Sequence, residues 1–352
     1  MCYPHFKRHQ GGAALIVALL VFAIASALLV ALQRDFTLHM QRGSNYLAGE
    51  QGWSYLLGAE ALGMVALRLD AQSDANSAAP VDHLGELWAG EATPYPLAEG
   101  GWLVGKLEDL QGRFNLNSLV DVPEAGDGTP GEDSEEALTV AAGEAAYSEA
   151  QKQFVRLLLT LEGTSINIDQ AISIMEAVAD FIDDDVRKRL NGAEDEAYLY
   201  SEPTYRTSGR PLASVSELRG VAGISPEIYR ALAPLVTVWP RQGGALNILT
   251  APSTVLRSLG TGSGLEPLSE ADGQRLVTAR REGMITSIDE LMEDVAFSAE
   301  DSGKLRDLLV ESSSWFLLSA TVEIADRELR LYSVLERDGE VILPRYRSTG
   351  EL

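Results

Sequence analysis

One apolar run near the N-terminus constrains the whole chain. Residues 13–32 contain no charged side chain, whereas Lys7 and Arg8 precede them and Arg34 follows. About 20 apolar residues in a helix span the ~30 Å hydrocarbon core of a bilayer, and a helix satisfies its own backbone hydrogen bonds there. Because basic flanks stay in the cytoplasm, we expect a transmembrane helix over residues 13–33 and the rest of the chain across the membrane.

Three kinds of N-terminal segment are compatible with this run. A cleaved secretory signal has a shorter apolar core and a small-residue cleavage site, but here residues 34–39 continue with helix-forming residues. A plain signal anchor has the right length and leaves the pair Gly11-Gly12 unexplained. The segment resembles a type IV prepilin leader, which is cut after a glycine on the cytoplasmic side. That interpretation predicts a leader over residues 1–12 and cleavage between Gly12 and Ala13.

The fifth residue after the predicted cleavage is Val17. Most pilins and pseudopilins have a glutamate at this position. A carboxylate in lipid is costly and persists only with a partner, commonly the N-terminal amine of a neighbouring subunit. Its absence indicates either a protein outside the pilin group or a subunit without such a neighbour, such as one at the tip of a filament.

Charge and rare residue types exclude several function classes. The 352-residue chain has a formal charge of −24, and nucleic-acid binding requires a basic footprint, so we expect no nucleic-acid partner. The only cysteine is Cys2, and the only histidines beyond residue 12 are His39 and His83. We therefore expect no disulfide framework, no thiol catalysis, no zinc site and no Ser-His-Asp hydrolase.

Hydrophobic patterns beyond the membrane segment predict an α+β fold. Helical periodicity continues to Asp70, so one long helix should run from the membrane into the next domain. Strand patterns cover residues 102–109 and 111–117, helical patterns then dominate, and strand patterns return from Trp315. The last two predicted strands are joined at Asp338-Gly339, a strong hairpin signal. This order indicates an α+β domain that is interrupted by an α-helical insert.

The predicted domain limits follow from these patterns. Beyond the leader and the transmembrane helix they are 34–120 for the N-terminal helix and first strands, 121–145 for an acidic loop, 146–312 for the inserted α-helical domain, and 313–352 for the C-terminal strands that complete the sheet. The acidic loop is rich in Pro, Gly, Asp and Glu, which is typical of a segment without regular structure.

The helical region contains two weak internal repeats. Residues 214–218 (SVSEL) are echoed by residues 287–291 (SIDEL), each with a serine cap and a leucine that we expect to be buried. Residues 115–118 (NLNS) are echoed by residues 247–250 (NILT). With a glycine-containing turn at 220–224, these segments resemble helix-hairpin-helix or SAM-like units. The acidity of the chain favours a structural role over DNA binding.

An acidic cluster follows the second predicted helix of the insert. Its candidate calcium ligands are Asp180, Asp183, Asp184, Asp185, Glu194 and Asp195. The first three fall on one face of a helix end, where like charges repel each other. A turn at residues 191–192 would fold the later acids back towards them and create the oxygen-rich environment that Ca²⁺ prefers. The spacing differs from the EF-hand loop, and a solvated acidic loop is the alternative interpretation.

A paired-carboxylate hydrolase is a second chemical interpretation, with Asp183 and Glu194 as the pair. Only Tyr198 and Tyr200 lie near them as aromatic residues for a substrate. Two carboxylates without a predicted cleft are weak support for an active site. A membrane-anchored periplasmic hydrolase is therefore kept as the alternative function.

Several motifs, taken in order, resemble the type II secretion minor pseudopilin K family. They are the leader ending at Gly12, the start Ala13–Val17, GRFNLN at 112–117, DFIDDD at 180–185 with GAEDEAY at 192–198, and LNILTAP at 246–252. The resemblance extends over nearly the whole chain and departs at Leu249, where a second asparagine is expected. It implies a pilin-like α+β fold, in which a long N-terminal helix packs on an antiparallel sheet, with a large inserted α-helical SAM-like or helix-hairpin-helix-like domain. It also implies calcium at the acidic segment, without assigning individual ligands.

The function implied by this resemblance is mechanical and needs no active site. The chain would be a minor pseudopilin in the tip complex that initiates the periplasmic pseudopilus and supports export of folded proteins across the outer membrane. The implied partners are minor pseudopilins I and J, with H, the major pseudopilin, the prepilin peptidase and the inner-membrane secretion platform. The implied location is the inner membrane, with a cytoplasmic N-terminus, a single span and a periplasmic C-terminal domain. N-terminal methylation would follow cleavage.

Overall fold

The computed structural model describes residues 11–75, 80–98, 100–120, 147–200, 202–260, 264–295, 303 and 305–350. The predicted acidic loop at 121–145 lies outside the described residues, as do residues 1–10 of the predicted leader.

A single helix, α1 (Gly11–Asp74), forms the N-terminal part of the chain. Its 64 residues contain no proline, so no backbone hydrogen bond is lost along it, and it is about 96 Å long at 1.5 Å per residue. None of its most apolar 18-residue stretch is buried, and large side chains such as Leu19 and Phe22 are exposed. The predicted continuity of the helix is confirmed, and its bare first half is compatible with a membrane anchor.

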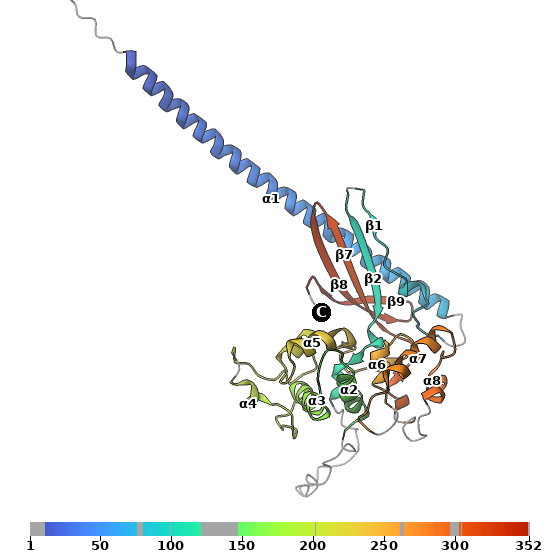
Figure 1. The fold of residues 1–352 in the computed structure, drawn as a ribbon. Helices are drawn as coiled ribbons and strands as arrows, with labels where there is room; N and C mark the ends of the chain where they lie inside the picture. Colours follow the sequence, from blue (N-terminus) through green and yellow to red (C-terminus); the bar gives the residue numbers. More distant parts are fainter. Residues whose placement is uncertain are drawn as a thin grey trace, which may run out of the picture.

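The second half of α1 packs on a five-stranded antiparallel sheet of order β1-β2-β7-β8-β9 (Figure 1). The strands are β1 (Tyr95–Pro96), β2 (Trp102–Asp109), β7 (Trp315–Ile324), β8 (Arg327–Asp338) and β9 (Val341–Ser348). β2 pairs with β7 along its full length although they are some two hundred residues apart in the chain. The chain therefore leaves the sheet at the end of β2, forms the insert, and returns to the sheet in the neighbouring strand β7.

Two tight turns set the register of the C-terminal strands. Ala325 and Asp326 both have positive φ, 50° and 56°, as the two-residue hairpin turn between β7 and β8 requires. Gly339, with φ 57°, follows Asp338 in the turn between β8 and β9. The predicted hairpin at Asp338-Gly339 is confirmed.

Alternate residues of β7 contact α1. Phe316, Leu318 and Val322 are buried in one cluster with Leu56 and Leu67 of the helix. Full burial of each such side chain contributes about 1.5–3 kcal/mol. Because successive side chains of a strand point to opposite faces of the sheet, these alternate residues form one apolar face, on which the long helix packs.

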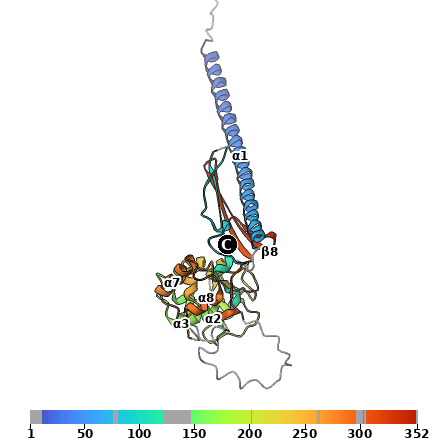
Figure 2. The same cartoon turned by 90° about the vertical axis from the view of Figure 1, so that its right-hand side faces the viewer.

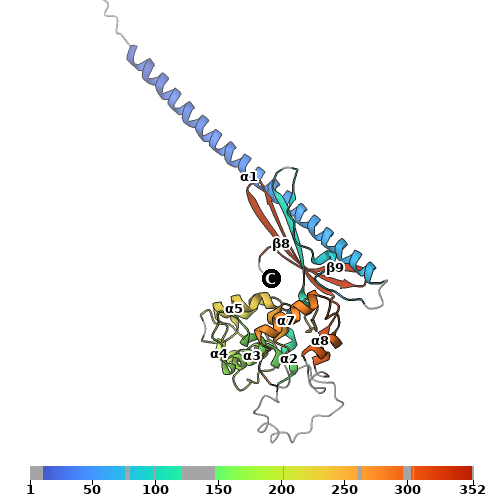
Figure 3. The same cartoon turned by 45° about the vertical axis from the view of Figure 1, so that its right-hand side comes forward.

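The inserted domain consists of short helices and two small parallel sheets. Its elements are η2 (Leu110–Gly112), β3 (Phe114–Asn115), η3 (Leu116–Leu119), α2 (Glu149–Leu159), α3 (Ile168–Ile182), α4 (Asp195–Tyr198), η6 (Val215–Gly220), α5 (Pro226–Leu232), η7 (Ala233–Leu235), β4 (Val236–Thr237), β5 (Leu246–Asn247), α6 (Ser253–Arg257), α7 (Glu270–Arg281), α8 (Ile288–Val295) and β6 (Leu309–Val310). The domain lies beyond the end of the sheet, on the side away from the exposed half of α1 (Figures 2 and 3).

The repeat seen in the sequence recurs in the structure. β3 pairs in parallel with β4, and β5 pairs in parallel with β6. Asn115 and Asn247 end the first strand of each pair, and the side chain of each accepts a hydrogen bond from the amide two residues later. Ser214 and Ser287 cap the two echoed segments. The insert therefore contains two related units, although the first echoed segment is a 3₁₀ helix.

The structure changes one domain boundary. Residues 110–120 were expected to complete the first part of the pilin-like sheet, but β3 is short and pairs with β4 inside the insert. Leu110, Phe114 and Leu116 are buried in the core of the helical domain. The boundary therefore lies at Asp109, where β2 ends. The sequence did not indicate this boundary, because β3 pairs with a strand that is far away in the chain.

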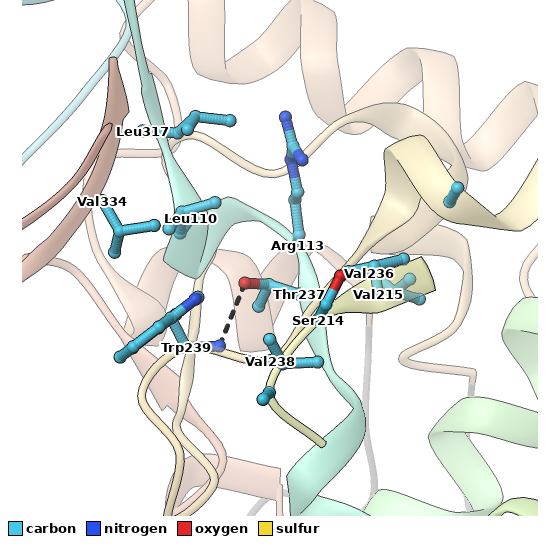
Figure 4. A pocket seen from close by; sticks show the side chains of 12 residues that line it. Leu110, Arg113, Ser214, Val215, Val236, Thr237, Val238, Trp239, Leu317 and Val334 are labelled. Carbon is cyan, nitrogen blue, oxygen red and sulfur yellow. Dashed lines mark hydrogen bonds between the residues drawn. The ribbon is translucent and has the colours of Figure 1, made fainter. Parts of the chain in front are cut away.

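The sheet and the insert share a contact surface. Leu317 and Val334, on the sheet face opposite α1, join the core of the helical domain. Figure 4 shows them with Leu110 and Trp239 around a cavity of about 70 Å³. The insert is thus packed against the sheet through apolar side chains.

Candidate metal centre

The acidic cluster forms where α3 ends and the chain returns to α4. Asp183 is the C-terminal cap of α3 and has extended backbone geometry, so the chain leaves the helix there. Residues 184–194 then lead to α4. Carboxylate oxygens of Asp183, Asp185 and Glu194 all lie within 4.8 Å of one another. The structure therefore brings together three of the six predicted ligands.

Two of these three carboxylates are buried and incompletely satisfied. Asp183 and Glu194 are each 7% exposed. Asp183 Oδ1 and Glu194 Oε1 are buried without a hydrogen-bond partner. A buried acceptor that lacks a partner costs about 1–3 kcal/mol. A bound cation would remove this cost by coordinating the two oxygens.

The pKa values of the cluster reflect this burial. Burial, followed by the negative charges of Asp180, Asp183 and Asp185, raises the pKa of Glu194 to about 7. Burial also raises the pKa of Asp183, although hydrogen bonds from Arg189 oppose the change. A bound divalent cation would favour the ionised form of both groups.

The other predicted ligands have different roles. Asp180 is fully buried and its Oδ1 accepts a hydrogen bond of 2.6 Å from Arg189 Nη1, which also lies 2.6 Å from Asp183 Oδ2. Asp195 Oδ1 accepts from both the amide and the hydroxyl of Thr207, at 2.9 Å each. Asp184 is exposed to solvent.

Gly192 lets the returning chain approach Asp180. A Cβ at this position would lie 2.0 Å from Asp180 Oδ2. Asn191 beside it donates its amide to Glu176 Oε2 at 2.5 Å. The amide of Gly192 donates to Arg189 O at 3.3 Å, which closes a turn where one was predicted, and Glu194 follows this turn to reach Asp183.

Sequence reasoning missed three parts of the polar architecture. Arg189 and Glu176 organise the cluster, but no motif marks either of them. A second acidic group, Asp70, Asp82 and Glu86, also has oxygens within 4.8 Å of one another. Its members come from α1 and the following segment, and Arg337 contacts two of them, Asp70 and Asp82.

The donor set at Asp183, Asp185 and Glu194 fits a hard cation. It offers carboxylate oxygens, which Ca²⁺ prefers, and lacks the nitrogen and sulfur ligands typical of zinc. Asp183 and Glu194 retain the two unpaired buried oxygens that a cation would bind.

Comparison with known proteins places this geometry in a family. The family model for "Type II secretion system (T2SS), protein K" matches residues 112–241. Type II secretion system protein K of Pseudomonas aeruginosa is 32% identical over 339 residues, covering 95% of this chain and 92% of the relative. The protein of the same name from Aeromonas hydrophila is 31% identical over 346 residues, covering 97% and 98%.

A solved structure has the same fold. A chain of the GspK-GspI-GspJ complex from the enterotoxigenic Escherichia coli type 2 secretion system matches with a TM-score of 0.68 at 24% identity. The match covers 88% of this chain and 100% of that one. The fold is pilin-like, with a long helix on an antiparallel sheet and an inserted helical domain, as expected. The comparisons do not support the hydrolase alternative. Similarity over nearly its whole length shows that this chain belongs to the type II secretion system protein K family.

Proposed function

We propose that this chain is a minor pseudopilin at the tip of the periplasmic pseudopilus, where it initiates the filament. The observation that carries the proposal is the placement of the insert. It lies beyond the sheet at the end of the molecule opposite the exposed apolar half of α1 (Figure 2). If that half is in the membrane, the helical domain is the part farthest from it.

This placement suits the end of a filament. Pilin-like subunits assemble through side-by-side packing of their long helices, so each added subunit needs room above its neighbour. The helical domain at this end would block a further subunit above it. Val17 supports the same position, because a tip subunit needs no glutamate to meet the N-terminal amine of a subunit beyond it.

The proposed partners are minor pseudopilins I and J, followed by H and the major pseudopilin. The solved complex contains a chain with this fold together with GspI and GspJ, which supports the first two. A groove of about 920 Å³ also runs between α1 and β2. Its helix side includes Gly58 and Gly63, and small residues allow another helix to approach closely.

The proposed topology places residues 13–33 in the inner membrane, with the N-terminus in the cytoplasm and the globular part in the periplasm. The prepilin peptidase would cut between Gly12 and Ala13, and methylation of the new N-terminus would follow. The inner-membrane secretion platform would then extract the subunit. The exposed apolar first half of α1 supports storage of the subunit in the bilayer before assembly.

Calcium has a structural role in this proposal. Asp183, Asp185 and Glu194 would hold the ion, which would connect the end of α3 to the start of α4. Neutralising the buried carboxylates would add to the folding stability of the insert, because a ligand that binds only the folded state stabilises it.

Secretion in a strain that lacks its own protein K tests the proposal. The intact gene should restore export of a type II substrate, and Gly12→Ala should leave the leader uncut and abolish export. Gly264→Ala is the control, because a Cβ there meets nothing within 4 Å. Normal export by an unprocessed Gly12→Ala chain would contradict the proposed function.

A further inference from the structure

A second acidic cluster lies at the joint between α1 and the segment that follows it. Asp70 belongs to the last turns of α1, and Asp82 and Glu86 follow in the next segment. One oxygen from each of the three carboxylates lies within 4.8 Å of the other two. The candidate calcium site of the insert uses none of these residues.

Asp82 supplies an independent sign of a missing ligand. It is fully buried, and its Oδ2 accepts hydrogen bonds from the amide of Ser313, at 2.6 Å, and from Arg337. Its Oδ1 has no hydrogen-bond partner. Buried polar atoms are nearly always paired, so this oxygen is an acceptor that the described protein groups do not satisfy.

The charges around Asp82 leave an excess that one divalent cation would neutralise. Arg337 binds Asp70 at 2.8 Å and also contacts Asp82. Three carboxylates and one guanidinium give a formal charge of −2. Asp74 contributes further negative charge, and the nearby His83 lies 3.7 Å from Glu86.

The pKa values support the same conclusion. Burial, followed by Asp82, raises the pKa of Asp70 to about 6, although Arg337 opposes the change. Burial raises the pKa of Glu86 to about 7, and Asp70 and Asp82 add to this although the Trp88 indole opposes it. The single arginine therefore does not offset the burial and mutual repulsion of these groups.

We propose that Asp70, Asp82 and Glu86 form a second divalent-cation site, which takes a hard ion such as Ca²⁺ through carboxylate oxygens. The site repeats the plan of the cluster in the insert, where Arg189 also holds two carboxylates and leaves buried oxygens unpaired.

The position of the site gives the ion a structural consequence. Asp82 donates its amide to Glu311 O at 2.8 Å, and its carbonyl accepts from Asn247 Nδ2 at 3.1 Å. Asn247 belongs to β5 of the insert. An ion bound by Asp70 and Asp82 therefore joins the end of the long helix to the helical domain.

Terbium luminescence on the full-length chain in detergent tests the site. Tb³⁺ replaces Ca²⁺ at oxygen sites, and a nearby indole excites it. Trp88 Nε1 donates to Glu86 Oε2 at 2.5 Å, so the indole lies beside the proposed ion. Excitation at the red edge of tryptophan absorption should give terbium emission that added Ca²⁺ suppresses.

Variants assign the signal to the cluster. Glu86→Gln and Asp70→Asn should each weaken terbium binding roughly tenfold or more through loss of a charged ligand, and Glu86→Gln should lower bound Ca²⁺ by one ion per chain in equilibrium dialysis. Glu91→Gln, an exposed neighbour in the same segment, and the double variant Asp183→Asn/Glu194→Gln should keep the signal.

Two results would overturn the second site. One is wild-type protein without tryptophan-sensitised emission. The other is unchanged terbium affinity in both Glu86→Gln and Asp70→Asn. Trp88→Phe is the check on the antenna, since it should lose emission while dialysis still finds the ion. Circular dichroism of each variant establishes that it is folded.

Discussion

Asp183 and Glu194 meet across the turn between α3 and α4, and each keeps one buried carboxylate oxygen without a hydrogen-bond partner. Asp183 ends a helix, whereas Glu194 precedes one. Their approach connects two segments that repel each other at neutral pH when no cation is present. We therefore predict that the stability of the insert depends on calcium.

Glu194→Gln should reduce stabilisation by calcium. A ligand at one hundred times its Kd stabilises the folded state by about 2.7 kcal/mol, so Tm of the wild-type protein should rise by roughly 5 °C or more between chelator and excess Ca²⁺. The variant should show less than half of this shift. Thermal melts followed by circular dichroism measure it.

Asp184→Asn is the matched control for this melt, because Asp184 is exposed and lies outside the group of three oxygens. It should keep the full calcium shift. An equal shift in the wild type and Glu194→Gln would remove Glu194 from the site.

The calcium-free protein should lose stability as pH rises from about 4.5 to about 7. Burial and the neighbouring carboxylates raise the pKa of Glu194 from 4.5 to about 7. The contribution of Glu194 to folding stability is therefore fully present below pH 4.5, where its carboxyl group is protonated in both the folded and the unfolded state. This contribution is lost as pH rises through 7. The pKa of Glu86 is also raised to about 7, so this group changes the stability in the same direction.

Urea unfolding at several pH values in the presence of chelator measures this dependence. Glu194→Gln should reduce the slope of unfolding free energy against pH. Part of the slope should remain in this variant, because Glu86 still titrates. Because Ca²⁺ binds the ionised carboxylate, stabilisation by calcium should increase over the same range. A wild-type slope that persists unchanged in Glu194→Gln would contradict the assignment.

Glu60→Ala should loosen the contact between α1 and the sheet. Glu60 is 2% exposed and accepts hydrogen bonds from Ser333 and from two nitrogens of Arg347, each at 2.7 Å. Burial would raise the pKa of Glu60, but these bonds lower it overall. The variant leaves the buried Ser333 hydroxyl unpaired, so unfolding free energy should fall by about 1–3 kcal/mol.

Glu328→Ala is the control for this measurement. Glu328 pairs with Arg330 on the surface of β8, and exposed pairs contribute about 0–1 kcal/mol. Equal losses in Glu60→Ala and Glu328→Ala, measured by chemical denaturation, would show that the buried contact has no special role.

Gly58→Leu should impair assembly without unfolding the chain. A Cβ at Gly58 meets nothing within 4 Å, and leucine is the better helix former by about 1 kcal/mol, so Tm should hold or rise. The larger side chain would fill the groove along α1 and weaken binding of I and J. Gly264→Leu, on an open part of the insert, should leave co-purification unchanged. Normal co-purification of Gly58→Leu would exclude the groove as a docking surface.

Much of the fold could be predicted because its signals are local. The apolar run and the helical periodicity beyond it predicted α1, and strand patterns with an Asp-Gly turn predicted β7, β8 and β9. The extent of β3 could not be predicted, because its partner β4 lies more than one hundred residues away. Parallel pairing of two-residue strands leaves no periodic pattern.

The candidate site was predicted only in part, for a similar reason. The turn at residues 191–192 brought Glu194 to Asp183 as expected, since glycine allows the close approach. The pairing of Arg189 with Asp180 and of Asp195 with Thr207 depends on tertiary packing. The group around Asp82 also had no signal, because Arg337 comes from the far end of the chain.

The proposed function requires this chain to form a tip complex with minor pseudopilins I and J. Native mass spectrometry of the three full-length, processed proteins, co-expressed and extracted in detergent, measures this assembly. We expect one complex that contains one copy of each chain. A chain that is folded and processed yet always recovered without I and J would contradict it.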